Sequence, residues 1–249
     1  MTTKHERSLL NHLLREVSWV GKDIFKYRDG GVGFENVLSA ETLQAIDFLP
    51  RTQFLGQILR GAHGADAGRL MLADEAEDCE IELLPGDIFL RDKTNEKDRG
   101  YSVQPDGLIK SNGAFCVVEA KRIKRNQFQE DQLSKEYFIA KRDCKGRQPL
   151  LLLILSKPPP VLVEGHGRLA IAEAIRLCLD DVYKKSERPR LTIEDFIAGI
   201  EECYAWITWA EMANIVREQA KAFEKNTSSI ERCVTRLSDS FLDAVKRHG

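Results

Sequence analysis

Two uninterrupted apolar segments set the strongest limits on the fold of this 249-residue chain. Residues 115–118 read Phe-Cys-Val-Val, and residues 150–155 read Leu-Leu-Leu-Leu-Ile-Leu. A strand with one wet face alternates apolar and polar residues, whereas a strand covered on both faces is apolar throughout. Both segments are therefore predicted to be buried strands of a central sheet, and such a sheet needs helices on its two faces. The pattern predicts an α/β protein.

The elements around these segments predict the topology. Asn112-Gly113 is a strong hairpin signal between two strand-like segments. The helical pattern that follows this hairpin leads to the second apolar segment and provides a crossover. Strands are expected over residues 80–84, 88–90, 101–110, 114–121, 150–155 and 203–207. A meander followed by a crossover predicts a three-layer α/β sandwich with a mixed central sheet.

Helices are expected on both sides of this sheet and after it. Their expected ranges are residues 4–20, 35–59 with a division at Pro50, 127–141, 168–183, a short helix from Thr192, 209–225 and 229–246. Thr208 with Glu211 forms a capping box at the start of the helix at residue 209. We expect a single domain over residues 1–249, with a core at about 35–225 and the helices at 4–20 and 229–246 as additions.

Composition excludes several classes of protein. The net charge of −2 provides no global basic field, and the 43% hydrophobic and 31% charged residues are ordinary for a soluble globular protein. The six cysteines form no C-x-x-C pair and have no histidine cluster beside them, which argues against a zinc site and a disulfide framework. No signal peptide or membrane-spanning segment is recognisable, so a cytoplasmic protein is expected.

Charge is unevenly distributed along the chain. Residues 74–98 contain ten acidic and three basic residues, whereas residues 121–147 contain nine basic and four acidic residues. The basic segment, which begins with Lys121-Arg122-Ile123-Lys124-Arg125, would contact a polyanion or form a solvated helix face.

Three charged residues stand at the ends of predicted strands. Asp106 follows Pro105, and Glu119 and Lys121 follow the buried segment 115–118 as an E-x-K triplet. Because side chains alternate along a strand, Glu119 and Lys121 point to the same face. Two carboxylates and an ammonium at one strand edge suit a divalent-metal site that hydrolyses a phosphodiester. The structural alternative is a turn aspartate beside a surface ion pair on an edge strand.

The arrangement Pro105-Asp106 … Glu119-Ala120-Lys121 resembles the PD-(D/E)xK nuclease superfamily, which has a restriction-endonuclease-like fold. The order of elements agrees over residues 35–155. The resemblance implies a Mg²⁺-dependent DNA nuclease, with Mn²⁺ as a substitute, in which Asp106, Glu119 and the Ala120 carbonyl are metal ligands. It further implies a glutamate from the preceding helix, for which Glu35 is the best candidate and which would complete the site or hold a second metal. It also implies a glutamine from the crossover helix: Gln132, with Gln129 as a rival.

Other interpretations stay open at this point. The second hypothesis is a protein of the same fold that binds nucleic acid or a protein partner without cleaving nucleic acid. The third hypothesis is a metal-dependent hydrolase that acts on a small phosphoester. DNA is the expected partner and RNA an alternative, and a homodimer is compatible with double-strand cleavage. Weaker features are Asp87, which follows Pro85-Gly86, the loop histidines 63 and 166, and Trp206 and Trp209, which are expected in the core.

Overall fold

The computed structural model describes residues 34–91, 101–121, 123, 127–187, 191–223 and 228–248. The helix expected over residues 4–20 lies outside these residues. Among the helices of the described part, none is long and apolar enough to cross a membrane.

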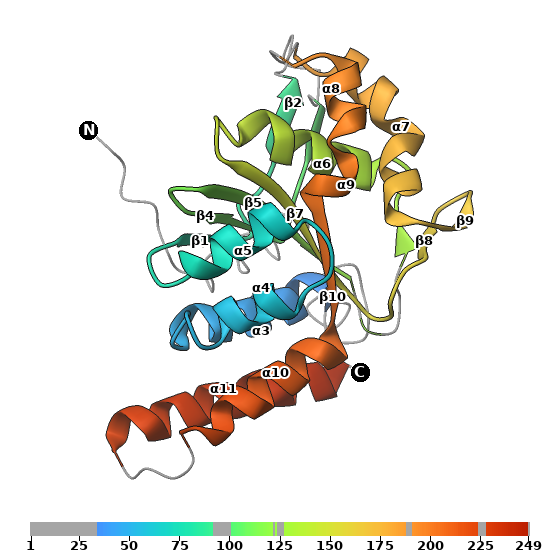
Figure 1. Cartoon of the computed structure of the whole chain (residues 1–249). Coiled ribbons are helices and arrows are strands. Elements are labelled where there is room, and N and C mark those ends of the chain that lie inside the picture. Colours follow the sequence, from blue (N-terminus) through green and yellow to red (C-terminus); the bar gives the residue numbers. More distant parts are fainter. Residues whose placement is uncertain are drawn as a thin grey trace.

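A five-stranded mixed sheet forms the centre of the described structure (Figure 1). Its strands lie in the order β1 (Glu80–Leu83), β4 (Gly107–Lys110), β5 (Ala114–Ala120), β7 (Gln148–Leu155) and β10 (Tyr204–Thr208). The first three strands pair antiparallel, whereas β7 pairs parallel with both β5 and β10. The expected α/β class, the meander and the crossover are confirmed.

The hairpin between β4 and β5 turns where the sequence predicts. Lys110 pairs with Phe115, and the N–H of Ser111 donates to the carbonyl of Ala114 at 3.0 Å. Asn112 and Gly113 form the two-residue turn, as expected for this dipeptide. The hairpin register brings the beginning of β4 beside the end of β5.

The central strands are covered on both faces, as their apolar sequences predict. All seven residues of β5 are buried, and so are the last six residues of β7. Phe115 and Val117 point into one core, and Cys116 and Val118 point into the other. The first of these cores is formed with α6 (Gln132–Asp143), α7 (Ile171–Lys185), α8 (Ile193–Ala198) and α9 (Ile200–Cys203).

The opposite face of the sheet is covered by the remaining described helices. These are α3 (Phe34–Phe48), α4 (Leu55–Gly61), α5 (Asp66–Asp74), α10 (Trp209–Lys221) and α11 (Ser229–His248). Figure 1 shows α10 and α11 as a helical hairpin lying along α3 and α4. The long final helix is therefore part of the core on this face, to which it contributes Val234 and Phe241.

Local capping chemistry explains where two helices begin. The Thr208 hydroxyl accepts the N–H of Glu211 at 3.2 Å, and the Glu211 carboxylate accepts the N–H of Thr208 at 2.8 Å. Thr192 and Asp195 make the same reciprocal contacts at the start of α8. Both predicted helix starts are confirmed, because each capping box satisfies two backbone donors that a helix leaves unpaired.

The single strand expected over residues 101–110 is wrong. Tyr101–Val103 forms β3, which pairs with β2 (Ile88–Arg91) in a separate two-stranded sheet. Pro105 has no N–H to donate, so the ladder of β4 cannot continue through it. The chain instead turns at residues 104–106, where the N–H of Leu84 donates to the Asp106 carbonyl at 2.9 Å.

The crossover helix begins later than its pattern predicts. Gln127–Phe128 forms β6, which pairs with β8 (Val161–Val163), and β8 pairs with β9 (Gly167–Leu169). The N–H of Glu164 donates to the Phe128 carbonyl at 3.0 Å. Long-range pairing and the burial of Phe128 thus override a local helical preference. For the same reason α7 begins at Ile171 rather than at residue 168.

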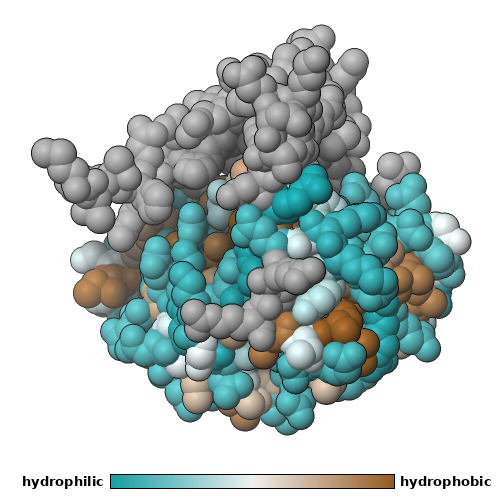
Figure 2. Space-filling view, turned by 90° about the horizontal axis from the view of Figure 1, so that it is seen from above, coloured by the Kyte–Doolittle hydropathy of each residue, from teal (hydrophilic) through white to brown (hydrophobic). Residues whose placement is uncertain are grey.

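Exposed large apolar side chains are distributed over several elements. They are Phe48, Leu70, Met71, Leu162, Leu177, Leu191, Ile197 and Ile230. In the view from above, hydrophilic residues prevail over the described surface and hydrophobic ones form small groups (Figure 2). Dispersed exposure of this kind is normal for a protein surface.

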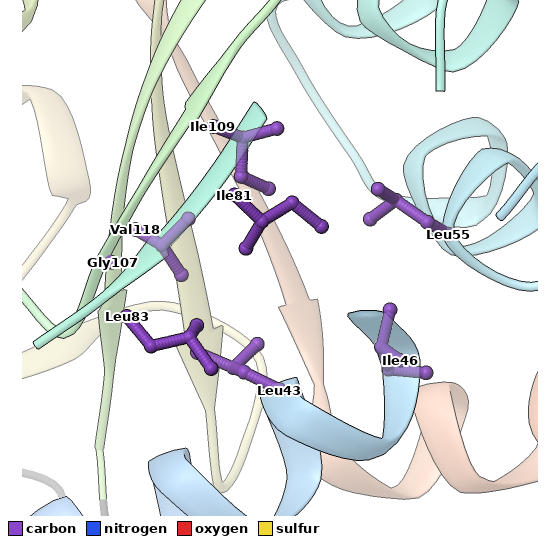
Figure 3. Close-up of a pocket in the computed structure, with 8 residues that line it drawn as sticks. All are labelled: Leu43, Ile46, Leu55, Ile81, Leu83, Gly107, Ile109 and Val118. Atoms are coloured by element: carbon purple, nitrogen blue, oxygen red, sulfur yellow. The ribbon is translucent and has the colours of Figure 1, made fainter. Parts of the chain in front are cut away.

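A small apolar cavity lies between the sheet and helices α3 and α4 (Figure 3). It is lined by Leu43, Ile46, Leu55, Ile81, Leu83, Gly107, Ile109 and Val118. Val118 and Glu119 point to opposite faces of β5. The cavity therefore lies behind the charged residues of the strand, and its lining offers no polar side chain for chemistry.

Gly107→Ala is expected to stabilise the protein by about 0.5–1 kcal/mol, because it removes backbone freedom from the unfolded chain and adds a methyl group towards the cavity. The nearest atom to the new Cβ would be the Glu82 carbonyl oxygen at 3.5 Å, an ordinary contact. Denaturant unfolding measures the change. Gly64→Ala is the matched control of opposite sign: its φ is +87°, and its Cβ would lie 2.7 Å from the Tyr204 carbonyl oxygen. A loss of stability in Gly107→Ala would contradict this packing.

Candidate active site

Glu119 and Lys121 lie at the end of β5, and their side chains point to the face of the sheet that α6 covers. Alternation along the strand gives them the same side as Val117, whose side chain belongs to the α6 core. Both residues are buried, with exposed fractions of 4% and 5%. The structural alternative of a surface pair on an edge strand is wrong, because β5 is the middle strand of the sheet.

Asp106 lies beside the same strand end, immediately before β4. Since Gly107 pairs with Val118, the next position brings Asp106 next to Glu119. The backbone N–H of Ala120 donates to Oδ2 of Asp106 at 2.7 Å, and the aspartate is buried. The break at Pro105 and the hairpin register together bring the two predicted carboxylates to one point of the sheet.

Gln132 connects the charged pair of β5 with α6. Nζ of Lys121 lies 2.7 Å from Oε1 of Glu119 and 3.1 Å from Oε1 of Gln132. Nε2 of Gln132 donates to the same Glu119 oxygen at 2.6 Å. The three side chains form a closed triangle in which the amide oxygen faces the ammonium and the amide nitrogen faces the carboxylate.

The structure decides between the two glutamines. Gln132 is the first residue of α6 and reaches the charged pair, whereas Gln129 is exposed in the segment before the helix. The crossover helix thus brings Gln132 to the charged pair, and the role of this glutamine in the site stays a prediction.

Glu136 lies beside Glu119, Lys121 and Gln132, although the sequence analysis did not select it. Its side chain is fully buried, and Gln132 Nε2 donates to its Oε1 at 2.9 Å. Burial first, and then the neighbouring Glu119 carboxylate, raise the pKa of Glu136 well above its ordinary value. The signal available in the sequence was the four-residue spacing from Gln132, which places both side chains on one face of the helix.

Aromatic residues enclose Lys121. Its ammonium lies 4.8 Å from the centroid of the Phe128 ring, a distance suited to a cation–π interaction. The indole N–H of Trp209, the first residue of α10, donates to the Lys121 carbonyl at 2.7 Å. The prediction that Trp209 lies in the core is confirmed, and this bond fixes the backbone of the site from the C-terminal part of the chain.

The other predicted site residues lie elsewhere. Glu35 falls in the first turn of α3, a helix that packs on the opposite face of the sheet, and its side chain lies outside the described part of the structure. Asp87 accepts hydrogen bonds from Ser102 and Gln104, both at 3.1 Å, and so belongs to the small sheet. Of the basic cluster, Arg122, Lys124 and Arg125 lie outside the described residues.

The two loop histidines form hydrogen bonds with glutamates outside the charged group at β5. His63 lies 2.9 Å from Glu211 and stacks on Trp206, with ring centroids 4.2 Å apart. His166 lies 2.9 Å from Glu130. Half-buried Trp206 is thus a partner of His63 at the edge of the sheet.

The polar group at β5 contains donors of the kind that Mg²⁺ or Mn²⁺ prefers. Asp106, Glu119 and Glu136 offer carboxylate oxygens, and Oε2 of Glu136 has no hydrogen-bond partner among the described residues. Hard divalent cations select oxygen ligands. Within the described residues, no three His, Cys, Asp or Glu side chains already converge as a metal-binding group. The chemical type of the donors fits the metal, while Lys121 and Gln132 occupy one oxygen of Glu119.

Comparison of the chain with protein-family models, with curated proteins and with solved structures finds no match.

Trp209→Phe is expected to destabilise the protein by about 1–3 kcal/mol, because it leaves the buried Lys121 carbonyl without its indole donor. The phenyl ring preserves most of the apolar packing, so the loss reports mainly on the hydrogen bond. Denaturant unfolding measures it, and Trp206→Phe is the matched control because the indole of Trp206 lies at the edge of the sheet. Equal losses in both variants would contradict a special role for the Trp209 bond.

Glu136→Gln is expected to stabilise the protein at neutral pH by about 1–3 kcal/mol, the cost of an unsatisfied buried polar group. The folded protein holds the Glu136 proton at pH values where the unfolded chain, with a pKa near 4.5, has released it. Wild-type stability therefore falls as the pH rises above 4.5 until it reaches the raised pKa, and glutamine has no such loss. Thermal unfolding between about pH 4 and pH 8 measures the difference in Tm. A stabilisation that grows towards acidic pH would contradict this assignment.

Proposed function

We propose that this protein is a metal-dependent nuclease of the PD-(D/E)xK type that hydrolyses phosphodiester bonds of DNA. The observation that carries the proposal is the buried group at the end of β5, where Asp106, Glu119 and Lys121 meet Gln132 from the crossover helix. Burying one ammonium among carboxylates costs free energy unless the groups are completely paired, and a site that performs chemistry is one place where a protein carries this cost. Such groups are typical of active sites.

The order of the strands supports the proposal. An antiparallel meander of β1, β4 and β5, followed by α6 and the parallel strand β7, is the arrangement that the resemblance to restriction-endonuclease-like proteins predicts. β10 adds a further parallel strand, and the end of β5 lies at the same sheet edge as the ends of β7 and β10. In open α/β sheets, ligand sites are common at the carboxyl ends of parallel strands.

Asp106 and Glu119 would hold Mg²⁺ or Mn²⁺ through their carboxylates. The Ala120 carbonyl and Glu35 are the further ligands that the resemblance implies. When bound, a divalent cation supplies Lewis acidity and positive charge for the scissile phosphate. The hydrogen bond from the Ala120 N–H orients the Asp106 carboxylate, so this ligand is fixed in place before any metal arrives.

Among the described residues, Lys121 is the group best placed to act on the phosphate. Hydrolysis forms a P–O bond to the oxygen of water, which gives up a proton, and breaks the P–O bond to the sugar oxygen, which takes up a proton from the solvent. Negative charge gathers on the phosphoryl oxygens during this exchange. An ammonium beside the metal ligands would stabilise that charge or orient the attacking water. Gln132 and the Phe128 ring limit the directions that Lys121 can take, and this limits the reorganisation required during the reaction.

The substrate class rests on charge. The basic stretch from residue 121 to residue 147 begins at the proposed site, and cations next to a phosphodiester site would bind the backbone of a nucleic acid. DNA is the proposed substrate, and RNA is tested beside it. A homodimer would present two such sites to the two strands of a duplex.

A binding protein of the same fold is the second candidate. One observation favours it: Lys121 and Gln132 already engage Glu119, and no three metal-binding side chains converge among the described residues. In that case the group would be a closed structural network, and nucleic acid would bind without being cut. Binding of labelled DNA that persists unchanged in Asp106→Asn, together with an absence of cleavage, would favour this candidate.

Cleavage assays test the proposal. Supercoiled plasmid, linear duplex, single-stranded DNA and RNA are incubated with the purified protein in Mg²⁺ or Mn²⁺. Asp106→Asn and Lys121→Met are each expected to lower the cleavage rate by at least about 100-fold, because each removes a charge that acts on the reacting phosphate. Glu130→Gln, a change at an exposed glutamate before α6, is the matched control and should cleave like the wild type.

Circular dichroism and thermal unfolding confirm that the variants are folded. The proposal is wrong if the wild type cleaves none of the substrates in either metal. It is also wrong if Asp106→Asn and Lys121→Met cleave at the wild-type rate, because the activity would then come from another site or from a contaminant.

A further inference from the structure

Glu136 is the most deeply buried ionisable residue of the group at β5, which comprises Asp106, Glu119, Lys121, Gln132 and Glu136. Its exposed fraction is 0%, against 4% for Glu119 and 5% for Lys121. One of its oxygens, Oε1, accepts from Gln132, and the other, Oε2, has no hydrogen-bond partner among the described residues. A buried polar atom without a partner costs free energy and requires an explanation.

Among the described side chains, no nitrogen or hydroxyl donor reaches Oε2 of Glu136. The Gln132 amide nitrogen is shared between Glu119 and Glu136, and its oxygen faces Lys121. The Lys121 ammonium contacts Glu119. Two carboxyl groups thus stand beside one ammonium, and the carboxyl groups of Glu136 and Glu119 share a side-chain hydrogen bond, which requires a proton between them. A cation with two positive charges is the kind of ligand that would relieve this arrangement.

Helix α6 cannot move easily to release Glu136 into water. Ser134 donates to the Ile175 carbonyl in α7 at 2.7 Å, and Tyr137 donates to the Phe196 carbonyl in α8. Both bonds are buried, and they come from residues one and two positions away from Glu136 in the helix. The helix therefore keeps the carboxyl group pointing towards the sheet, although an apolar residue of similar volume would pack there at lower cost.

We propose that Oε2 of Glu136 is a further ligand of the divalent cation that binds at Asp106 and Glu119. This inference rests on the proposed function, because it requires that a cation binds there. Oxygen from a carboxylate is the ligand that Mg²⁺ and Mn²⁺ select. The proposal gives α6 a direct part in holding the metal, through Glu136, which lies four positions after Gln132.

Metal binding can be measured without cleavage. Calorimetric titration with MnCl₂ is performed on the wild type and on Glu136→Gln, Asp106→Asn, Glu119→Gln and Glu130→Gln. Glu136→Gln keeps the size of the side chain and an acceptor for Gln132, but it has no proton to release and so cannot provide an anionic oxygen to a cation. We expect its Kd for Mn²⁺ to rise at least about tenfold, a loss typical for a group that supports a metal site. Glu130→Gln should bind like the wild type.

Thermal unfolding with and without Mn²⁺ separates a ligand from a purely structural residue. Without metal, Glu136→Gln is expected to be the more stable protein, for the reason given above. With saturating Mn²⁺ the wild type should gain more in Tm than Glu136→Gln, because only tighter binding to the folded state raises stability. If Glu136 has only a structural role, Mn²⁺ should raise the Tm of the wild type and of Glu136→Gln by the same amount, whatever the difference between the two proteins without metal.

The outcomes distinguish this inference from the proposed function. Weaker Mn²⁺ binding in Asp106→Asn and Glu119→Gln, with wild-type affinity in Glu136→Gln, would overturn the role of Glu136 and leave the metal site intact. A wild-type protein that binds no Mn²⁺ at millimolar concentration would overturn both. Weaker binding in all three variants, with unchanged binding in Glu130→Gln, is the result expected.

Discussion

Burial of β5 on both faces is the constraint on which the rest of the structure depends. Every residue of this strand is enclosed, and the hairpin, the crossover helix and the parallel neighbour β7 are all arranged to enclose it. Charged residues at the end of such a strand need ion-pair or hydrogen-bond partners, because burial deprives each charge of water. Asp106, Lys121 and Gln132 surround Glu119 at the point where the apolar sequence stops. The polar group is a consequence of where the strand ends.

The contacts of this group differ from those of the surface ion pairs. Lys184 and Lys185 pair with aspartates one helical turn away in exposed positions, where water weakens the attraction. Lys121 instead has an exposed side-chain fraction of 6% and meets its partners across two elements of the fold. A network of this kind contributes little to stability compared with apolar packing. The apolar core must therefore offset the cost of burying this group, and the proposed function gives that cost a chemical purpose.

Much of the fold was predictable because its signals are local. Asn112-Gly113 specifies a hairpin by its backbone preferences, and Thr208 with Glu211 starts a helix by hydrogen bonds within four residues. The pairing of Asp106 with Glu119 followed from the same hairpin. Glu136 and the strand at Phe128 were missed because their roles depend on partners far away in the sequence. In the sequence, a buried glutamate cannot be told from an exposed charged residue of a helix, because its burial depends on the strand that packs against it. No periodicity indicates that Oε2 of Glu136 lacks a hydrogen-bond partner.

The hydrogen bond from Trp209 to the Lys121 carbonyl joins residues that are 88 positions apart. During synthesis, the segment that contains Asp106, Glu119 and Gln132 would leave the ribosome well before Trp209 and β10. The backbone of Lys121 would thus acquire its last support only when the C-terminal part of the chain has been made. A protein with a reactive centre at this position would complete that centre late in its own biosynthesis, and a truncated chain that ends before Trp209 would lack this support.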